Sequence, residues 1–139
     1  MQRAFFGVLL LIAAVAAGGC DNEIDNPPAT QPPPTTTDTF SGTISVNGAM
    51  THTFTVAVAG TVTATLTEVA PDPAIAVGFS MGRWNASSSF CEQIIPNDNA
   101  VQGQILTGNA SGPGTLCARI YDTGKLTGAL NYTISVVHP

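Results

Sequence analysis

The chain of 139 residues has the length of one domain. Only 9% of its residues are charged, against roughly 25% in an average globular protein. Four Lys and Arg against nine Asp and Glu give a formal charge of −5, which argues against a nucleic-acid binder, because such proteins need a basic patch. The 14 Gly, 10 Pro, frequent Thr and 44% apolar content favour an exported, β-rich protein over a helical cytosolic one.

The N-terminus has the layout of an export signal. Arg3 supplies a positive charge ahead of a fourteen-residue apolar run over 4–17. As a helix, this run would be about 21 Å long, which is shorter than the roughly 30 Å hydrocarbon core of a bilayer. A signal sequence over residues 1–19 is therefore favoured over a permanent membrane span. The alternative is an ordinary secretory signal cut nearby, which would leave Cys20 as an unpaired thiol.

The segment Ala17-Gly18-Gly19-Cys20 resembles the lipobox of bacterial lipoproteins. This resemblance implies that Cys20 becomes the mature N-terminus and carries a diacylglyceryl thioether. Two or three acyl chains anchor a protein durably. Without residues 1–19, three basic and nine acidic side chains remain, so the acyl chains rather than attraction to anionic lipid would hold the protein. The expected location is the cell envelope, on a membrane face exposed to the periplasm or the exterior.

Residues 20–38 are expected to join the anchor to the folded domain. Positions 21–38 contain five prolines and almost no apolar side chain, so this stretch cannot bury enough surface to fold. Pro-rich chain favours polyproline II at about 3.1 Å per residue, which gives a semi-stiff tether tens of Å long. A polyproline ligand at 32–34 is the less favoured reading. The folded domain is expected over 39–139.

Alternation of Thr with apolar residues dominates the rest of the chain and predicts half-buried strands. Asn47-Gly48 and the segment 112–114 are turn signals. Residues 83–96 lack a clear period and are expected to be irregular. About seven or eight strands at ten-residue spacing indicate an all-β fold, an antiparallel β-sandwich of the jelly-roll kind. The expected strands cover residues 40–46, 51–58, 61–67, 75–81, 101–106, 116–120 and 132–136.

Cys91 and Cys117 are the two cysteines left once Cys20 is lipidated. Two cysteines in an exported domain are expected to form a disulfide, since export supplies an oxidising compartment. Closing a loop of this length stabilises the fold by about 3 kcal/mol in the chain-entropy model. The alternative, a metal site on both thiolates, lacks His or Cys partners at ligand spacing.

Residues 40–137 resemble the bacterial pre-peptidase C-terminal (PPC-like) family of small β-sandwiches. The resemblance is carried by four short segments, 54–62, 71–79, 112–122 and 131–134. It implies a non-catalytic accessory domain, and sandwiches of this shape also serve as carbohydrate-binding modules. Leu116-Cys117 stands where the family has a Tyr, and a single Asp stands where many members carry Asp-x-Asp.

The sequence offers few groups for catalysis. It has no Gly-x-Ser-x-Gly motif, and a triad assembled from His52, Asp122 and a Ser has no supporting spacing. The acidic residues Asp72, Asp98 and Asp122 are weak candidates for a Ca²⁺ site, because hard cations prefer oxygen ligands. The simpler interpretation of these carboxylates is solvated surface charge. No other cofactor is expected.

Two aromatic residues are candidates for ligand binding. Trp84 and Tyr121 offer flat faces on which sugar rings can stack. The alternative for Trp84 is a core position beside Cys91. We therefore expect a lipid-anchored, non-catalytic module whose partner is an envelope protein or, alternatively, an envelope glycan. A hydrolase with an unrecognised site is the least favoured reading.

Overall fold

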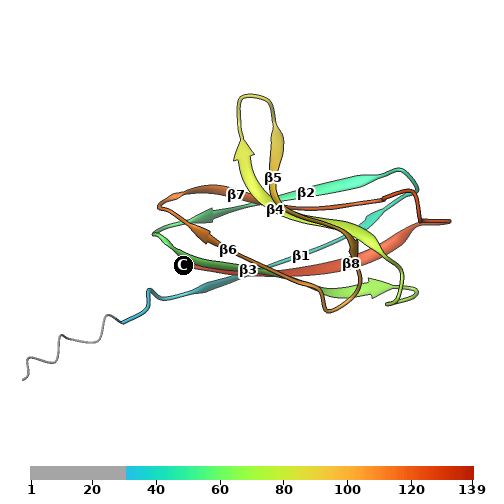
Figure 1. Ribbon diagram of the computed structural model, residues 1–139, viewed down its shortest axis with the longest axis horizontal. Helices are drawn as coiled ribbons and strands as arrows, with labels where there is room; N and C mark the ends of the chain where they lie inside the picture. The colour runs from blue at the N-terminus through green and yellow to red at the C-terminus, as the bar shows by residue number, and fades with distance from the viewer. Residues whose placement is uncertain (1–30) are drawn as a thin grey trace, which may run out of the picture. The chain divides into compact units, whose positions relative to one another are not determined.

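The computed structural model describes residues 31–139, so the expected signal segment and Cys20 lie outside the described residues. Residues 31–139 contain no helix with the length and hydropathy needed to span a bilayer. Figure 1 shows this part of the chain as a β structure. Its strands are β1 (Thr36–Ile44), β2 (Ala49–Val56), β3 (Gly60–Ala70), β4 (Val77–Asn85), β5 (Phe90–Ala100), β6 (Ile105–Ala110), β7 (Gly114–Tyr121) and β8 (Leu130–His138).

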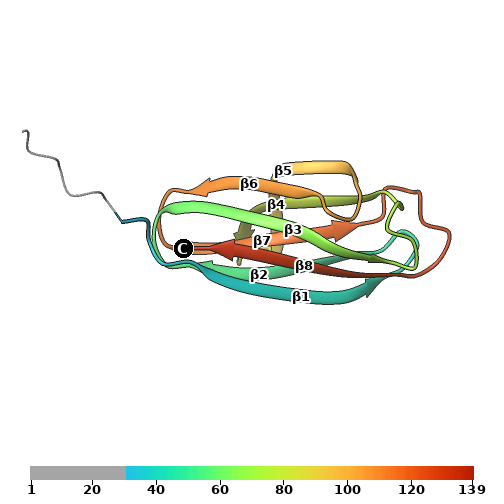
Figure 2. The same ribbon diagram turned by 90° about the horizontal axis from the view of Figure 1, so that it is seen from below.

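The eight strands form two four-stranded antiparallel sheets, in the orders β1-β8-β3-β6 and β2-β7-β4-β5. The sheets lie face to face, as Figures 1 and 2 show from two directions. Consecutive strands alternate between the sheets except at β4–β5, which form a hairpin. This order is that of a jelly roll. The expected fold class, an antiparallel β-sandwich, is confirmed.

Alternation of side chains along the strands builds the core between the sheets. In β8, Leu130, Tyr132, Ile134 and Val136 are buried, and the residues between them are more exposed. β3 contributes Val62, Ala64 and Leu66 in the same way. The intervening Thr and Ser face solvent, which β-branched Thr tolerates well. In β3 and β8 the period-2 pattern of the sequence therefore reports directly which face of the strand is buried.

A polar contact joins the two sheets at their β1/β2 edge. His52 of β2 lies 2.7 Å from the Tyr132 hydroxyl of β8, measured from its Nε2, and its ring stacks on Phe40 at 4.8 Å. Gly42 makes room for this hydroxyl, because a Cβ there would lie 2.6 Å from it. Burial lowers the pKa of His52, which favours the neutral imidazole. The Tyr132 hydroxyl therefore has a hydrogen-bond partner inside the core.

The sequence prediction was wrong for residues 83–96, which belong to the β4–β5 hairpin. β4 continues to Asn85, a turn follows, and β5 begins at Phe90. β5 is an edge strand that pairs only with β4, so much of it remains in water. Phe90 is 49% exposed and Ile94 is 65% exposed. Pro96 also lies in this strand, which edge strands allow. These features hide the period-2 pattern.

Other boundaries differ by a few residues. β1 begins at Thr36 and ends at Ile44, because the Asn47-Gly48 turn starts with a bond from the Gly48 N–H to the Ser45 carbonyl. The strand expected at 101–106 lies later, at Ile105–Ala110, after a turn over 101–104. The strand expected over 51–58 ends earlier, at Val56, and Val58 beyond it is 45% exposed.

Glycine at position 82 allows β5 to pass over β4. A Cβ at Gly82 would overlap the carbonyl group of Glu92 in β5. The pairing of β4 with β5 shifts at this point, since Met81 faces Ile95 whereas Gly82 faces Gln93. The extra residue, Ile94, forms a bulge, and bulges bend and twist a strand. The close approach is therefore built from a glycine on one strand and a bulge on the other.

We predict that Gly82→Ala destabilises the domain. Overpacking of this kind typically costs about 1–3 kcal/mol, because the β5 backbone must move away. Denaturant unfolding measures the loss. Gly128→Ala is the matched control, since nothing lies within 4 Å of a Cβ there and its backbone is outside the left-handed region. Equal stability of Gly82→Ala and Gly128→Ala would contradict the close approach of β5 to β4 at Gly82.

Candidate binding groove

A groove lies between the β4–β5 hairpin and the connection from β6 to β7. Its cavity volume is about 330 Å³. The hairpin contributes Arg83, Trp84 and Ile94 to the lining, and residues 109–116 form the other wall. A smaller apolar hollow adjoins it and shares the side chains of Ile94 and Asn109. The volume falls at the lower end of the range for small-molecule sites.

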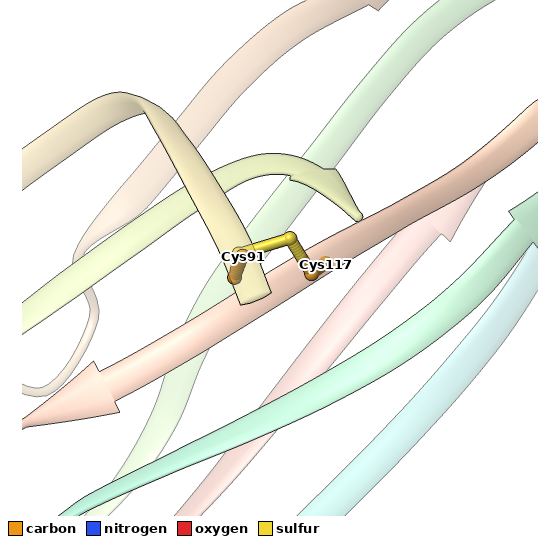
Figure 3. Close-up of a disulfide and its surroundings, with 2 residues drawn as sticks. All are labelled: Cys91 and Cys117. Atoms are coloured by element: carbon orange, nitrogen blue, oxygen red, sulfur yellow. A yellow bond between two sulfur atoms is a disulfide. The ribbon is translucent and has the colours of Figure 1, made fainter. Parts of the chain in front are cut away.

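The Cys91–Cys117 disulfide fixes the hairpin that forms one wall. The two Cα atoms are 5.9 Å apart, although β5 and β7 are separated by β4 in the sheet order. Strands two places apart in a flat sheet would be roughly 9–10 Å apart, so β5 must lie across β4 here. Figure 3 shows the bond joining the two strands. Both cysteines are buried, which confirms the pairing expected from the sequence and shows where it acts.

Trp84 stands near the end of β4, beside the disulfide. Its partner across the hairpin is Cys91. The indole is half-buried and lines the groove. It is absent from the hydrophobic core cluster between the sheets. Trp84 therefore lies near the tip of the hairpin and presents part of its surface to the groove.

Arg83 brings a positive charge to the same wall, and its side chain is exposed. Glu92 faces Arg83 across the hairpin, but its carboxylate accepts a hydrogen bond from the Asn85 amide at 3.2 Å. Among residues 31–139 the recorded ion pair is His138 with Asp38, at 3.1 Å, so Arg83 has no carboxylate within 4.0 Å in this part of the chain. The guanidinium is thus available to a ligand.

Tyr121 lies away from the groove. It pairs with Gly78, six residues before Trp84 on β4, which places the two aromatic residues about 20 Å apart along the strand. The Tyr121 hydroxyl donates to Asp98, and the Arg119 guanidinium lies 5.5 Å from the ring centre. The structure therefore does not bring the two predicted aromatic residues into one site.

The three acidic candidates for calcium have separate local roles. Asp72 accepts the Ala74 N–H at 2.9 Å, and Asp98 accepts the Tyr121 hydroxyl. Asp122 accepts four backbone N–H groups, from Asn47, Gly124, Lys125 and Leu126. These hydrogen bonds hold the pKa of Asp122 below its usual range, and the one from the Asn47 N–H has the largest effect. Within the described residues no three His, Cys, Asp or Glu side chains gather as a metal site would require.

The two histidines each bond to a residue of the fold. His52 contacts Tyr132, and His138 bonds to Asp38 while its ring lies 5.2 Å from Phe54. Asp122 is bonded to backbone groups of neighbouring loops. The hydrogen bonds recorded for residues 31–139 do not link either histidine to a serine.

Sequence reasoning missed most of the groove. Arg83 and Ile94 were assigned to an irregular segment, and within the wall formed by 109–116 only a turn at 112–114 and the start of a strand at 116 were predicted. The two walls are about 25 positions apart in the chain, so no local pattern connects them. Two signals were available: Trp84, predicted as a stacking face, lines the groove, and the Cys91–Cys117 disulfide ties the hairpin to β7.

No protein-family model matches the chain, and no curated protein matches it significantly.

The titration of Tyr121 tests the placement of its side chain. Burial, with the hydrogen bond to Asp98, raises the pKa of Tyr121 from 10.0 to about 12. Because the neutral phenol is favoured in the folded state, its stabilising contribution is present below pH 10.0 and is lost as the pH rises through about 12. We predict that Asp98→Asn lowers the pKa of Tyr121, measured by NMR titration of labelled tyrosine rings.

Glu68→Gln is the matched control for this experiment. It removes one negative charge from β3, in the other sheet, and should leave Tyr121 unchanged. A Tyr121 titration that is unaffected by Asp98→Asn would contradict the hydrogen bond.

Proposed function

We propose that the protein is a bacterial lipoprotein, anchored by acyl chains on Cys20, whose sandwich is a non-catalytic, PPC-like module that binds an envelope glycan. The groove beside the disulfide carries this proposal, because a fixed hairpin holds an aromatic face against a polar wall. Aromatic faces with nearby polar groups are suited to sugar rings. The lipobox-like segment at 17–20 and the Pro-rich stretch after it support the anchored location.

The polar wall is suited to hydroxyl groups. Asn109, Ser111 and Thr115 line it, and the Asn109 carbonyl oxygen accepts the Thr61 hydroxyl at 3.2 Å. The Asn109 side chain is exposed, and Thr61, its partner across β3 and β6, is exposed as well. A protein partner of this groove would meet the same groups, but the small cavity and the single half-buried indole favour one or two rings over a broad protein surface.

The groove lies at the end of the sandwich where the chain enters the domain. β3 begins there, because Gly60 pairs with Ala110 at the end of β6. A Cβ on Gly60 would meet Pro139 and, at 3.6 Å, Pro33. The β6–β7 wall therefore adjoins the segment that leads back toward Cys20.

Removal of the Cys20 thiol tests the anchor. Wild-type protein expressed in a bacterium is expected in the membrane fraction and is released only by detergent, because acyl chains cost about 0.8 kcal/mol per CH₂ to expose to water. Cys20→Ser should move the protein into the soluble or uncleaved pool. Mass spectrometry of the mature N-terminal peptide is the independent readout. An unacylated wild-type N-terminus would refute the lipoprotein assignment.

Replacement of Trp84 tests the binding site. Trp84→Ala is expected to abolish retention on immobilised envelope polysaccharide, since the stacking face is lost. The free energy of unfolding should fall by less than about 2 kcal/mol, because a half-buried side chain loses less than the 3–5 kcal/mol of a core aromatic. Urea unfolding and affinity chromatography measure the two effects.

Phe90→Ala is the control for Trp84→Ala. It removes an aromatic ring, 49% exposed, from the same hairpin without touching the groove lining. Retention by Phe90→Ala and loss by Trp84→Ala support the proposal. A large loss of stability in Trp84→Ala, with retention unchanged, would show that this residue only supports the hairpin.

A further inference from the structure

We propose that the ligand of the groove is an acidic saccharide, with Arg83 pairing with its carboxylate and Trp84 stacking on its ring. This inference rests on the proposed glycan-binding function and adds the chemical class of the glycan. It is carried by the distribution of charge around the groove.

Residues 31–139 contain three cationic side chains, and two of them have partners. Arg119 lies over the Tyr121 ring, and the Lys125 ammonium donates to the Asn99 amide oxygen. Arg83 is exposed in the groove lining and has no carboxylate within 4.0 Å in this part of the chain. The one unengaged cation thus lies beside the one tryptophan.

The rest of the groove lining is neutral, since it contains no Asp or Glu. This is notable in a stretch whose six acidic residues outnumber its three basic ones. Glu92, the carboxylate across the hairpin from Arg83, is outside the lining and bonds to Asn85. An anionic group can therefore approach the guanidinium without meeting a carboxylate on the groove wall.

The chemistry of the two adjacent residues selects the ligand class. A guanidinium offers two parallel N–H donors that match a carboxylate. The indole offers an apolar face for the C–H side of a pyranose ring. A uronic acid carries both features in one unit, whereas an acidic peptide carries the carboxylate without the ring. The groups on the opposite wall, including the Asn109 amide, can then bind the hydroxyls.

Calorimetry with a matched pair of ligands tests the inference. The purified full chain, in detergent, is titrated with polygalacturonate oligomers and with their methyl esters, which keep the ring but lose the charge. We expect the free acid to bind about tenfold more tightly than the ester, the ratio that one charged hydrogen bond supplies. The advantage of the acid should shrink as salt rises, because salt screens the ion pair.

Three variants assign the charge effect to Arg83. Arg83→Gln should weaken binding of the free acid about tenfold and leave the ester unchanged. Arg83→Lys should recover part of the loss, since it keeps the charge without the paired donors. Lys125→Gln is the matched control: it makes the same change in net charge in the loop after β7, away from the groove, and should bind the acid like wild type.

Distinct outcomes separate this inference from the proposed function. Equal binding of acid and ester, both lost in Trp84→Ala, would overturn the acidic ligand and leave the glycan function standing. Binding of poly-glutamate as tight as that of polygalacturonate would show that no sugar ring is recognised, and tighter binding of dextran sulfate would overturn the carboxylate. An equal loss of affinity for the acid in Lys125→Gln would show that net charge, rather than contact with Arg83, causes the preference for the acid. Absence of binding to every saccharide tested would overturn both.

Discussion

The crossing of β5 over β4 at Gly82 is the constraint on which the groove depends. The missing side chain at Gly82 and the bulge at Ile94 let the two backbones approach, and the Cys91–Cys117 bond holds them there. A disulfide acts mainly by restricting the unfolded chain, by about 3 kcal/mol for a loop of this length. Here it also fixes a hairpin that pairs with the sandwich along one edge only. Without it, the outer part of the hairpin would have few core contacts.

The two ends of the sandwich use polar groups differently. At one end, Asp122 binds backbone N–H groups of two connections, and Tyr121 with Asp98 ties β7 to β5. These groups satisfy one another, which stabilises loops but leaves little for a ligand. At the other end, Arg83 has no carboxylate within 4.0 Å among the described residues and lines an open cavity. The groups available to bind a ligand therefore lie at the end of the sandwich where polar side chains are not used in hydrogen bonds within the fold.

The sequence predicted the sandwich because a strand with one face in the core and the other toward solvent alternates apolar and polar residues with period 2. β3 and β8, both internal in their sheet, show this most clearly. It failed for β5, an edge strand whose Phe90 and Ile94 face water and whose register is broken by bulges. The Cys91–Cys117 disulfide was predictable because an exported domain is expected in an oxidising compartment and because these are the two cysteines left besides Cys20. The groove was not, since its walls meet only through the jelly-roll connection between distant strands.

The groove lies at the end of the sandwich where the folded part of the chain begins. Pro139, Gly60 and Pro33 approach one another at the end of the sandwich that also carries the β6–β7 wall. The proposed anchor on Cys20 would raise the effective concentration of any ligand fixed to the same surface. A shallow groove with one aromatic face and one cation can therefore retain an anchored ligand that it would bind only weakly in free solution.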